Sequence, residues 1–215
     1  MYAPATPVAP AQTLTPVGVV STAPVTIAAP LATHLKVRHQ LLNVLESHRA
    51  SVTGSLMEGS HPAHAGRIVT LQSLAAHGWK TVATSRTGAS GRFRLSLMPR
   101  RLGSHWLRLH FRGDIYARSS HRRIGKLNVF RLAGASWYGG GGGLACGGQL
   151  TSSTMGVANK TLPCGTMVTL RYSGHTVRVP VVDRGPYVAG REFDLTEATK
   201  RALGFGDTGD VWSTN

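Results

Sequence analysis

Apolar and polar side chains alternate along most of the chain between residues 41 and 132. In Gly91-Arg92-Phe93-Arg94-Leu95-Ser96-Leu97, apolar residues take every second position and arginine or serine stands between them. The segment Leu107-Arg108-Leu109-His110-Phe111-Arg112 repeats this order. A period of two predicts β-strands with one buried face. The same criterion predicts further strands at residues 50–56, 67–73, 79–84 and 126–132.

Glycine- and serine-rich turns separate these predicted strands, which follow one another at intervals of about ten residues. Such spacing is typical of an antiparallel β-sandwich of immunoglobulin-like or transthyretin-like type. We therefore expect a β-sandwich domain at residues 41–132. Its polar rows are basic, and we expect four arginines to share one solvent-exposed face: Arg92, Arg94, Arg108 and Arg112.

Residues 1–40 have a different composition, rich in Ala, Pro, Thr and Val, with no charged side chain before Lys36. Repeated prolines oppose a helix, and the few bulky apolar residues oppose independent folding, so we expect a flexible extended segment. Prolines also interrupt the apolar stretch at residues 17–32. We therefore expect no transmembrane segment, and no intact signal peptide is visible.

The charge is placed unevenly along the chain. The net charge is +15, from 24 Lys and Arg against 9 Asp and Glu. Residues 1–133 carry 17 of the cations and only three acids, which are Glu46, Glu58 and Asp114. One interpretation is a domain that holds anionic wall polymers of a cell envelope, and another is a solvated basic face without a partner.

Two other ligand classes are not expected for this half of the chain. It has no helix-turn-helix, zinc-finger or aromatic RNA-binding signature, so we expect no nucleic-acid partner. Its histidines lack the spacing of metal ligands, so we expect no metal and no cofactor.

The second half begins with glycine-rich sequence and continues with alternating strands. Residues 167–172 and 175–179 predict a hairpin around Ser173-Gly174. The apolar run at residues 177–182 leads to Asp183 and a Gly-Pro turn, which predicts a carboxylate at the edge of a sheet. Thr196 can cap a short helix at residues 197–203 that ends at Gly204, and Val211 and Trp212 supply a closing strand.

Several short motifs occur in a fixed order in this half. They are Ala135-Ser136-Trp137-Tyr138-Gly139, Thr161-Leu162-Pro163-Cys164-Gly165-Thr166, Val181-Val182-Asp183-Arg184-Gly185-Pro186-Tyr187, Gly190-Arg191 and Phe193-Asp194-Leu195-Thr196. This series resembles the RlpA-like (rare lipoprotein A) family, relatives of expansins, over about residues 135–215. The resemblance implies a six-stranded double-psi β-barrel at residues 133–215, which gives an all-β protein of two domains whose partner is the glycan strand of peptidoglycan.

The resemblance also implies a reaction. RlpA-like lytic transglycosylases cleave glycan strands without water: a carboxyl group protonates the linkage after N-acetylmuramic acid, and the 6-hydroxyl of that sugar closes a 1,6-anhydro ring. Asp183 would be the acid/base and Asp194 its assistant. Glycosidic cleavage commonly uses two carboxylates, and the motifs keep these two near one edge.

Other motif residues are candidates for substrate contact: Trp137, Tyr138, Gln149, Arg184, Tyr187 and Arg191. Trp137 and Tyr138 can form a platform for a sugar ring, or both can be core residues. Arg184 and Arg191 can instead pair with Asp194 or Glu192.

The chain departs from active family members in two places. Gln149 stands where they carry a glutamate, and Asn159 stands where a histidine often precedes Lys-Thr-Leu-Pro. Because Gln149 cannot transfer a proton, these changes favour an alternative function, expansin-like glycan binding without cleavage. A third hypothesis is a secreted protease inhibitor, since small double-psi barrels can also have that role.

Cys146 and Cys164 are the only cysteines. Only His175 offers a further soft ligand in this domain, so a disulfide is favoured over a metal site. Closing such a loop stabilises the fold by about 3 kcal/mol. A disulfide requires an oxidising compartment, and we expect a secreted or envelope-associated bacterial protein that is a monomer.

Overall fold

The computed structural model describes residues 29–215. Most of the segment expected to be flexible, residues 1–28, lies outside the described residues. The rest of that segment differs from the expectation, because strand β1 already begins at Thr33. Leu35 of β1 is buried in the sandwich core and Val37 packs against that core, so the sheet reaches eight residues further back than residue 41.

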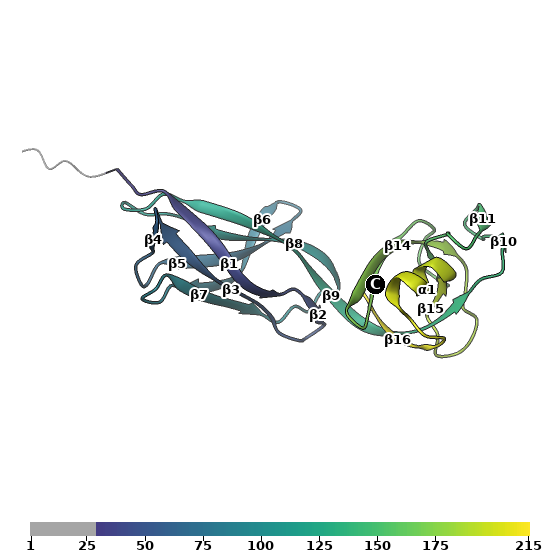
Figure 1. The fold of residues 1–215 in the computed structure, drawn as a ribbon. Coiled ribbons are helices and arrows are strands. Elements are labelled where there is room, and N and C mark those ends of the chain that lie inside the picture. The colour runs from purple at the N-terminus through teal and green to yellow at the C-terminus, as the bar shows by residue number, and fades with distance from the viewer. Residues whose placement is uncertain (1–28) are drawn as a thin grey trace, which may run out of the picture.

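The first half of the described chain forms two facing sheets (Figure 1). One contains β1 (Thr33–Leu41), β3 (Ala50–Glu58), β4 (His61–Pro62) and β7 (Arg92–Leu97), with β3 in the centre. The other contains β2 (Asn43–Leu45), β5 (Ile68–Ala75), β6 (Gly78–Arg86), β8 (Gly103–Phe111) and the first part of β9 (Ser120–Tyr138). The inward-pointing apolar residues of both sheets form one buried cluster, as expected for a β-sandwich.

The sandwich does not gather its arginines on one face as the sequence predicted. Arg92 and Arg94 lie on β7, whereas Arg108 lies on β8 in the opposite sheet. There Arg108 donates a hydrogen bond from Nε to Gln72 Oε1 (2.8 Å) and stacks on the ring of Trp79. Alternation along a strand identifies its outward residues, but the pairing of strands decides which of the two outer faces they occupy.

The second half of the chain closes into a barrel of six strands. They are the end of β9, β12 (Val157–Ala158), β13 (Met167–Tyr172), β14 (His175–Asp183), β15 (Phe193–Thr196) and β16 (Gly209–Ser213). Each strand pairs with the next in the order β9, β15, β12, β14, β13, β16, and β16 pairs again with β9. The pairs β9–β15 and β12–β14 are parallel and the others antiparallel. A second apolar cluster fills this ring.

Strand β9 belongs to both halves, so the boundary expected between residues 132 and 133 lies inside a continuous strand. Its first part pairs with β8 and its last part with β16 and β15, so it runs unbroken from the sandwich into the barrel (Figure 1). Gly134 lies in this strand where another backbone segment approaches closely. A Cβ there would lie 2.1 Å from the carbonyl oxygen of Gly190, so the position admits only glycine.

The local predictions for the second half are confirmed. β13 and β14 form the antiparallel hairpin around Ser173-Gly174. Helix α1 (Glu197–Leu203) begins after Thr196, whose side chain accepts a hydrogen bond from the amide of Thr199, and ends at Gly204 with φ of 64°. A small hairpin of β10 (Gly142–Gly143) and β11 (Gln149–Leu150) precedes β12. No helix within residues 29–215 has the length and hydropathy needed to span a membrane.

Candidate active site

Asp183 is the last residue of β14, at one end of the barrel. Its Oδ1 atom accepts hydrogen bonds from the backbone amides of Ala145 (2.9 Å) and Arg184 (2.8 Å). Within residues 29–215, Oδ2 accepts no hydrogen bond from another side chain or amide, and the residue is partly exposed. Asp183 also forms no salt bridge within this range. One carboxylate oxygen is thus anchored while the other remains available.

A β-bulge turns this carboxylate toward Asp194. Val179 and Val181 point into the barrel core, and a strict period of two would point Asp183 inward as well. The parallel pairing of β12 and β14 shifts at this point, because Val157 pairs with Val181 but Ala158 pairs with Asp183. The extra residue on β14 places Asp183 on the same face as Ala158, and bulges commonly redirect side chains beside active sites.

Asp194 lies on the other side of β12, opposite the same residue. Ala158 pairs with Asp194 on β15 as well as with Asp183 on β14, so the two carboxylates flank one residue. Two strand spacings separate them, about 10 Å between their backbones. Asp194 Oδ1 accepts a hydrogen bond from the hydroxyl of Ser136, its partner on β9.

The phenol of Tyr138 lies next to both carboxylates. Tyr138 follows Ser136 by two residues on β9 and so points to the same face. Its Oη atom is buried and makes no hydrogen bond of acceptable geometry within the described residues. Burial raises the pKa of Tyr138, and the nearby Asp183 carboxylate and then the charge of Asp194 raise it further. The phenol therefore keeps its proton at neutral pH, and its O–H group lies beside Asp183, to which it can donate.

Trp137 points to the opposite face of β9 from Tyr138 and joins a different group of residues. Its Nε1 donates a hydrogen bond to Asp207 Oδ1 (3.0 Å), and the ammonium of Lys200 lies 3.8 Å from the ring centroid. Lys200 and then Trp137 lower the pKa of Asp207 by donating hydrogen bonds to its carboxylate. The two aromatic residues of the motif are therefore not one platform, because alternation along the strand separates them.

Arg184 organises the loop beside the carboxylates. Its Nη1 donates to the carbonyl oxygens of Asn159 (3.1 Å) and Leu162 (2.9 Å), and it forms neither of the expected pairs with Asp194 or Glu192. Glu192 pairs instead with Arg131 of β9. The guanidinium thus ties the segment after β12 to the end of β14.

Asn159, which stands where family members often carry histidine, is a buried structural residue. Its Oδ1 accepts hydrogen bonds from the amides of Thr161 (3.0 Å) and Leu162 (2.8 Å), and its Nδ2 donates to the Glu192 carbonyl (3.0 Å). Its own amide donates to the carbonyl of Asp183 (3.1 Å). Sequence reasoning did not assign these roles to Asn159, nor the Asp194 contact to Ser136, although both residues lie in or beside the motifs.

The remaining candidates lie at the surface around this end of the barrel. Tyr187 is 80% exposed and Gln149 is exposed on β11, while Arg191 is partly exposed. None of these three side chains makes a hydrogen bond within residues 29–215. They are available to a ligand, in contrast to Arg184.

The predicted disulfide between Cys146 and Cys164 is confirmed, with 5.5 Å between the Cα atoms. It joins the loop after β10 to the loop that Arg184 holds. The amide of Cys146 donates to the Val182 carbonyl (3.2 Å), directly beside the Ala145 amide that anchors Asp183. The covalent bond therefore stabilises the segment that positions the carboxylate.

Several hollows lie on the sandwich, and a smaller one adjoins the β13–β14 turn. None of these is lined by Asp183 or Asp194. The candidate site is therefore defined by its side chains and not by one of these hollows. Within the same residues no three His, Cys, Asp or Glu side chains form a group that could hold a metal ion.

The closed ring of six strands, with two parallel pairings and carboxylates near strand ends, defines the second half as a double-psi β-barrel. Residues 132–211 match the model of the double-psi barrel family described as "Lytic transglycolase". This barrel is a member of the RlpA-like family.

Several curated proteins are similar to this chain. The probable endolytic peptidoglycan transglycosylase RlpA of Aquifex aeolicus is 36% identical over 113 residues, covering 50% of each chain. The protein of the same name from Synechocystis is 35% identical over 101 residues, 40% of this chain and 32% of the relative. The endolytic peptidoglycan transglycosylase RlpA of Pseudomonas aeruginosa UCBPP-PA14 is 38% identical over 87 residues, which cover 38% of this chain and 26% of the relative. The chain thus spans half or less of these relatives.

Among solved structures, the Streptomyces papain inhibitor is similar at 24% identity, covering 40% of this chain and 92% of that one. Its TM-score is 0.33, which is too low to carry an argument.

Proposed function

We propose that the barrel is a lytic transglycosylase that cleaves peptidoglycan glycan strands, with Asp183 as acid/base. The observation that carries the proposal is the juxtaposition at one barrel end of an anchored carboxylate, a second carboxylate and a protonated phenol. The family match over residues 132–211 supports it.

The proposed reaction needs no water. Asp183 in its protonated form gives its proton to the oxygen that links N-acetylmuramic acid to the next sugar, and the bond from C1 to that oxygen breaks. The 6-hydroxyl oxygen of the same muramic acid bonds to C1, and its proton passes to the Asp183 carboxylate. The acid form is restored, so atoms and charge balance.

Two neighbours are given supporting roles in this proposal. The carboxylate of Asp194 stabilises the positive charge that develops at C1 when the linkage breaks. Tyr138 is a positioning residue: its buried phenol can donate a hydrogen bond to Asp183. Anchoring of Oδ1 by two amides leaves Oδ2 as the oxygen that exchanges the proton.

Glycan binding without cleavage is the second candidate. Gln149 favours it, because this exposed side chain stands where active family members carry a glutamate and it cannot transfer a proton. The side chains of Tyr187 and Arg191, which make no hydrogen bond within residues 29–215, serve equally well in binding and in catalysis.

The substrate and the disulfide both point to a location outside the cytoplasm. Peptidoglycan lies in the envelope, and disulfides persist in oxidising compartments. We therefore propose a secreted or envelope-associated monomer whose basic sandwich adds attraction for the anionic polymers of the wall.

The deciding experiment incubates the full chain with peptide-free glycan strands and measures 1,6-anhydromuramic ends by mass spectrometry. We expect ends to form, and Asp183→Asn to slow their formation by about 10²–10⁴-fold, the usual contribution of a general acid. Asp210→Asn, which removes an exposed acid of β16 outside the site, is the matched control and should retain full activity.

Two outcomes would overturn parts of the proposal. If Asp183→Asn keeps its activity, Asp183 is not the acid. If the unmodified chain sediments with glycan but generates no anhydro ends, the barrel binds without cutting and the second candidate holds.

A further inference from the structure

The outer face of the β1–β3–β7 sheet combines basic rims with a floor of small hydroxyl groups. We name it the basic face and define it by its exposed cationic or titratable side chains, which are Lys36, Arg38, His39, Arg92 and Arg94. The central strand β3 contributes two outward hydroxyl residues between the rims, Thr53 and Ser55. The face lies on the sandwich, in the half of the molecule that has no part in the proposed reaction.

Strand register aligns these side chains in two rows. Ser55 pairs with Lys36 on one side and Arg92 on the other. Thr53 likewise stands between His39 and Arg94. The rims are about 10 Å apart, two strand spacings, and the rows repeat every ~6.8 Å along β3. The result is a trough of two rows, with Lys36 and Arg92 beside the first and His39 and Arg94 beside the second.

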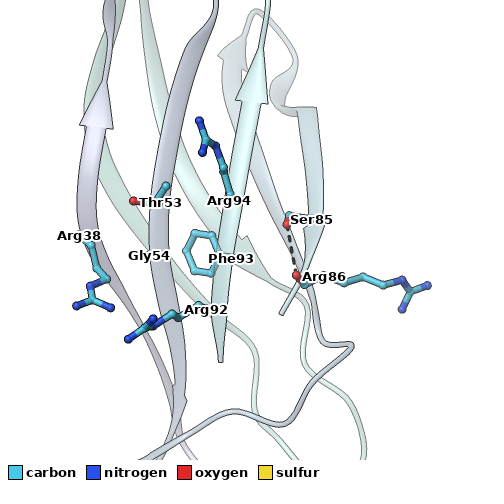
Figure 2. Close-up of a pocket in the computed structure, with 8 residues that line it drawn as sticks. All are labelled: Arg38, Thr53, Gly54, Ser85, Arg86, Arg92, Phe93 and Arg94. Carbon is cyan, nitrogen blue, oxygen red and sulfur yellow. Dashed lines mark hydrogen bonds between the residues drawn. The ribbon is translucent and has the colours of Figure 1, made fainter. Parts of the chain in front are cut away.

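A β-bulge adds one more cation to the first rim. The register of β1 against β3 shifts between Val37 and His39, so Arg38 is an extra residue. Val37 packs against the core and His39 faces outward opposite Thr53, which lets Arg38 project outward as well. Figure 2 shows Arg38 and Arg92 extending to the same side of the sheet, Arg94 further along β7, and Arg86 pointing away.

A hollow of about 600 Å³ adjoins these residues. Half of the residues that line it are arginines, namely Arg38, Arg86, Arg92 and Arg94. The other lining residues are Thr53, Gly54, Ser85 and Phe93. The ring of Phe93 lies between β3 and β7 and is buried, so the charged groups beside this hollow are the guanidinium groups of its four arginines.

These cations have no internal counter-charge within the described residues. Lys36, Arg38, Arg92 and Arg94 form no salt bridge in residues 29–215. The one acid on the strands of this sheet, Glu58, is buried on the inner side and accepts from Arg67 and His64. Positive charges that face one trough repel one another, and an external polyanion relieves that repulsion.

We propose that the basic face binds a linear phosphate polymer, without bases, lying along β3. The guanidinium group of arginine can donate two parallel hydrogen bonds to phosphate oxygens, and the hydroxyl groups of Ser55 and Thr53 can donate to them as well. Cationic side chains spread over two successive rows suit a polymer better than a single anion. The outward residues of the three strands include no Phe, Tyr or Trp, and binding of single-stranded nucleic acid relies on aromatic stacking of bases. The chemistry therefore favours phosphate alone.

The test measures binding of the full chain to long-chain inorganic polyphosphate as a function of salt. The variant Lys36→Gln/Arg92→Gln/Arg94→Gln removes three charges from the trough. We expect its dissociation constant to rise about tenfold or more, and the salt dependence of log K to fall by about 3. The matched control Arg101→Gln/Arg112→Gln/Arg123→Gln removes three exposed charges elsewhere on the sandwich and should change affinity less than about twofold.

A second variant separates binding from folding. Ser55→Glu places an acid between Lys36 and Arg92, where cross-strand pairing supports the sheet. It should abolish polyphosphate binding while the thermal unfolding midpoint stays unchanged.

Three results would overturn the proposal. Equal losses in both triple variants would mean that net charge alone binds the polymer. Equal affinity for poly-L-glutamate would mean that the basic face does not distinguish phosphate groups from carboxylates. Tighter binding of a single-stranded oligonucleotide than of polyphosphate would identify a nucleic-acid surface instead.

Discussion

The sandwich and the barrel share one strand, but the groups left without a salt bridge at their two candidate sites have opposite charge. In the sandwich, two of the three acids, Glu58 and Asp114, form salt bridges with Arg67. The cations of the basic face therefore have no acidic partner among them. In the barrel, Asp183 and Asp194 form no salt bridge within the described residues and share one face with the protonated phenol of Tyr138. Acids that stabilise are paired with cations, whereas acids placed for chemistry are kept apart from them.

The comparison also predicts that the two halves are stabilised separately. Each has its own apolar cluster, and β9 is the element that both contain. Substitutions inside one half should therefore change hydrogen–deuterium exchange in that half alone. The four predictions below run from the largest expected effect to the smallest.

Glu58→Leu should destabilise the sandwich most. Glu58 is buried and accepts hydrogen bonds from Arg67 (2.9 Å) and His64 (2.9 Å), so its removal leaves a partly buried guanidinium with one partner fewer. We expect a loss of about 3 kcal/mol, measured by urea unfolding. Glu46→Leu, at an exposed position, is the control and should change little. Accelerated exchange in the barrel as well would show that the two halves unfold as one unit.

Loss of the disulfide should act on the barrel only. Cys146→Ser/Cys164→Ser releases the loop that carries the Ala145 amide, and the barrel should lose about 3 kcal/mol by the chain-entropy argument. Reducing agent added to the unmodified chain should reproduce the effect, while exchange in the sandwich, which has no cysteine, stays constant. A sandwich that loosens on reduction would contradict the separation.

Tyr138→Phe should separate stability from activity. The buried Oη has no hydrogen-bond partner of acceptable geometry within residues 29–215, so removing it should leave the barrel unchanged or more stable by about 1 kcal/mol. Formation of anhydro ends should nevertheless slow, because the donor beside Asp183 is lost. A variant that is clearly less stable would mean that the phenol does have a partner in solution.

The smallest effect is a dependence of sandwich stability on pH. Burial, and then the charges of Arg108 and His121, lower the pKa of His110 below 6.5 in the folded state. Above pH 6.5 both folded and unfolded states hold a neutral His110. As the pH falls below that value, the unfolded state binds the proton first, so folding stability decreases until the folded pKa is reached. His110→Gln should flatten this part of the curve of unfolding free energy against pH.

Local patterns in the sequence were sufficient to predict many of the strands and the helix. The alternation around Phe93 and Leu109, the hairpin at Ser173-Gly174 and the capped helix after Thr196 all occur in the structure. Each depends on near neighbours in sequence, whose contacts are set by backbone geometry and side-chain type. The start of β1 was missed because its few apolar residues follow a proline-rich segment without an evident boundary.

The sequence by itself determined the all-β character, the cysteine pair, the division of charge and the motif that ends in Asp183. The tertiary structure decided the rest: that β9 passes unbroken between the two halves, that Trp137 and Tyr138 face opposite ways, and that Arg184 holds backbone carbonyls. It also decided that a bulge opposite Ala158 turns Asp183 toward Asp194. These features depend on which strands pair and in which register, and pairing is set by packing between residues distant in the chain, which no local pattern contains.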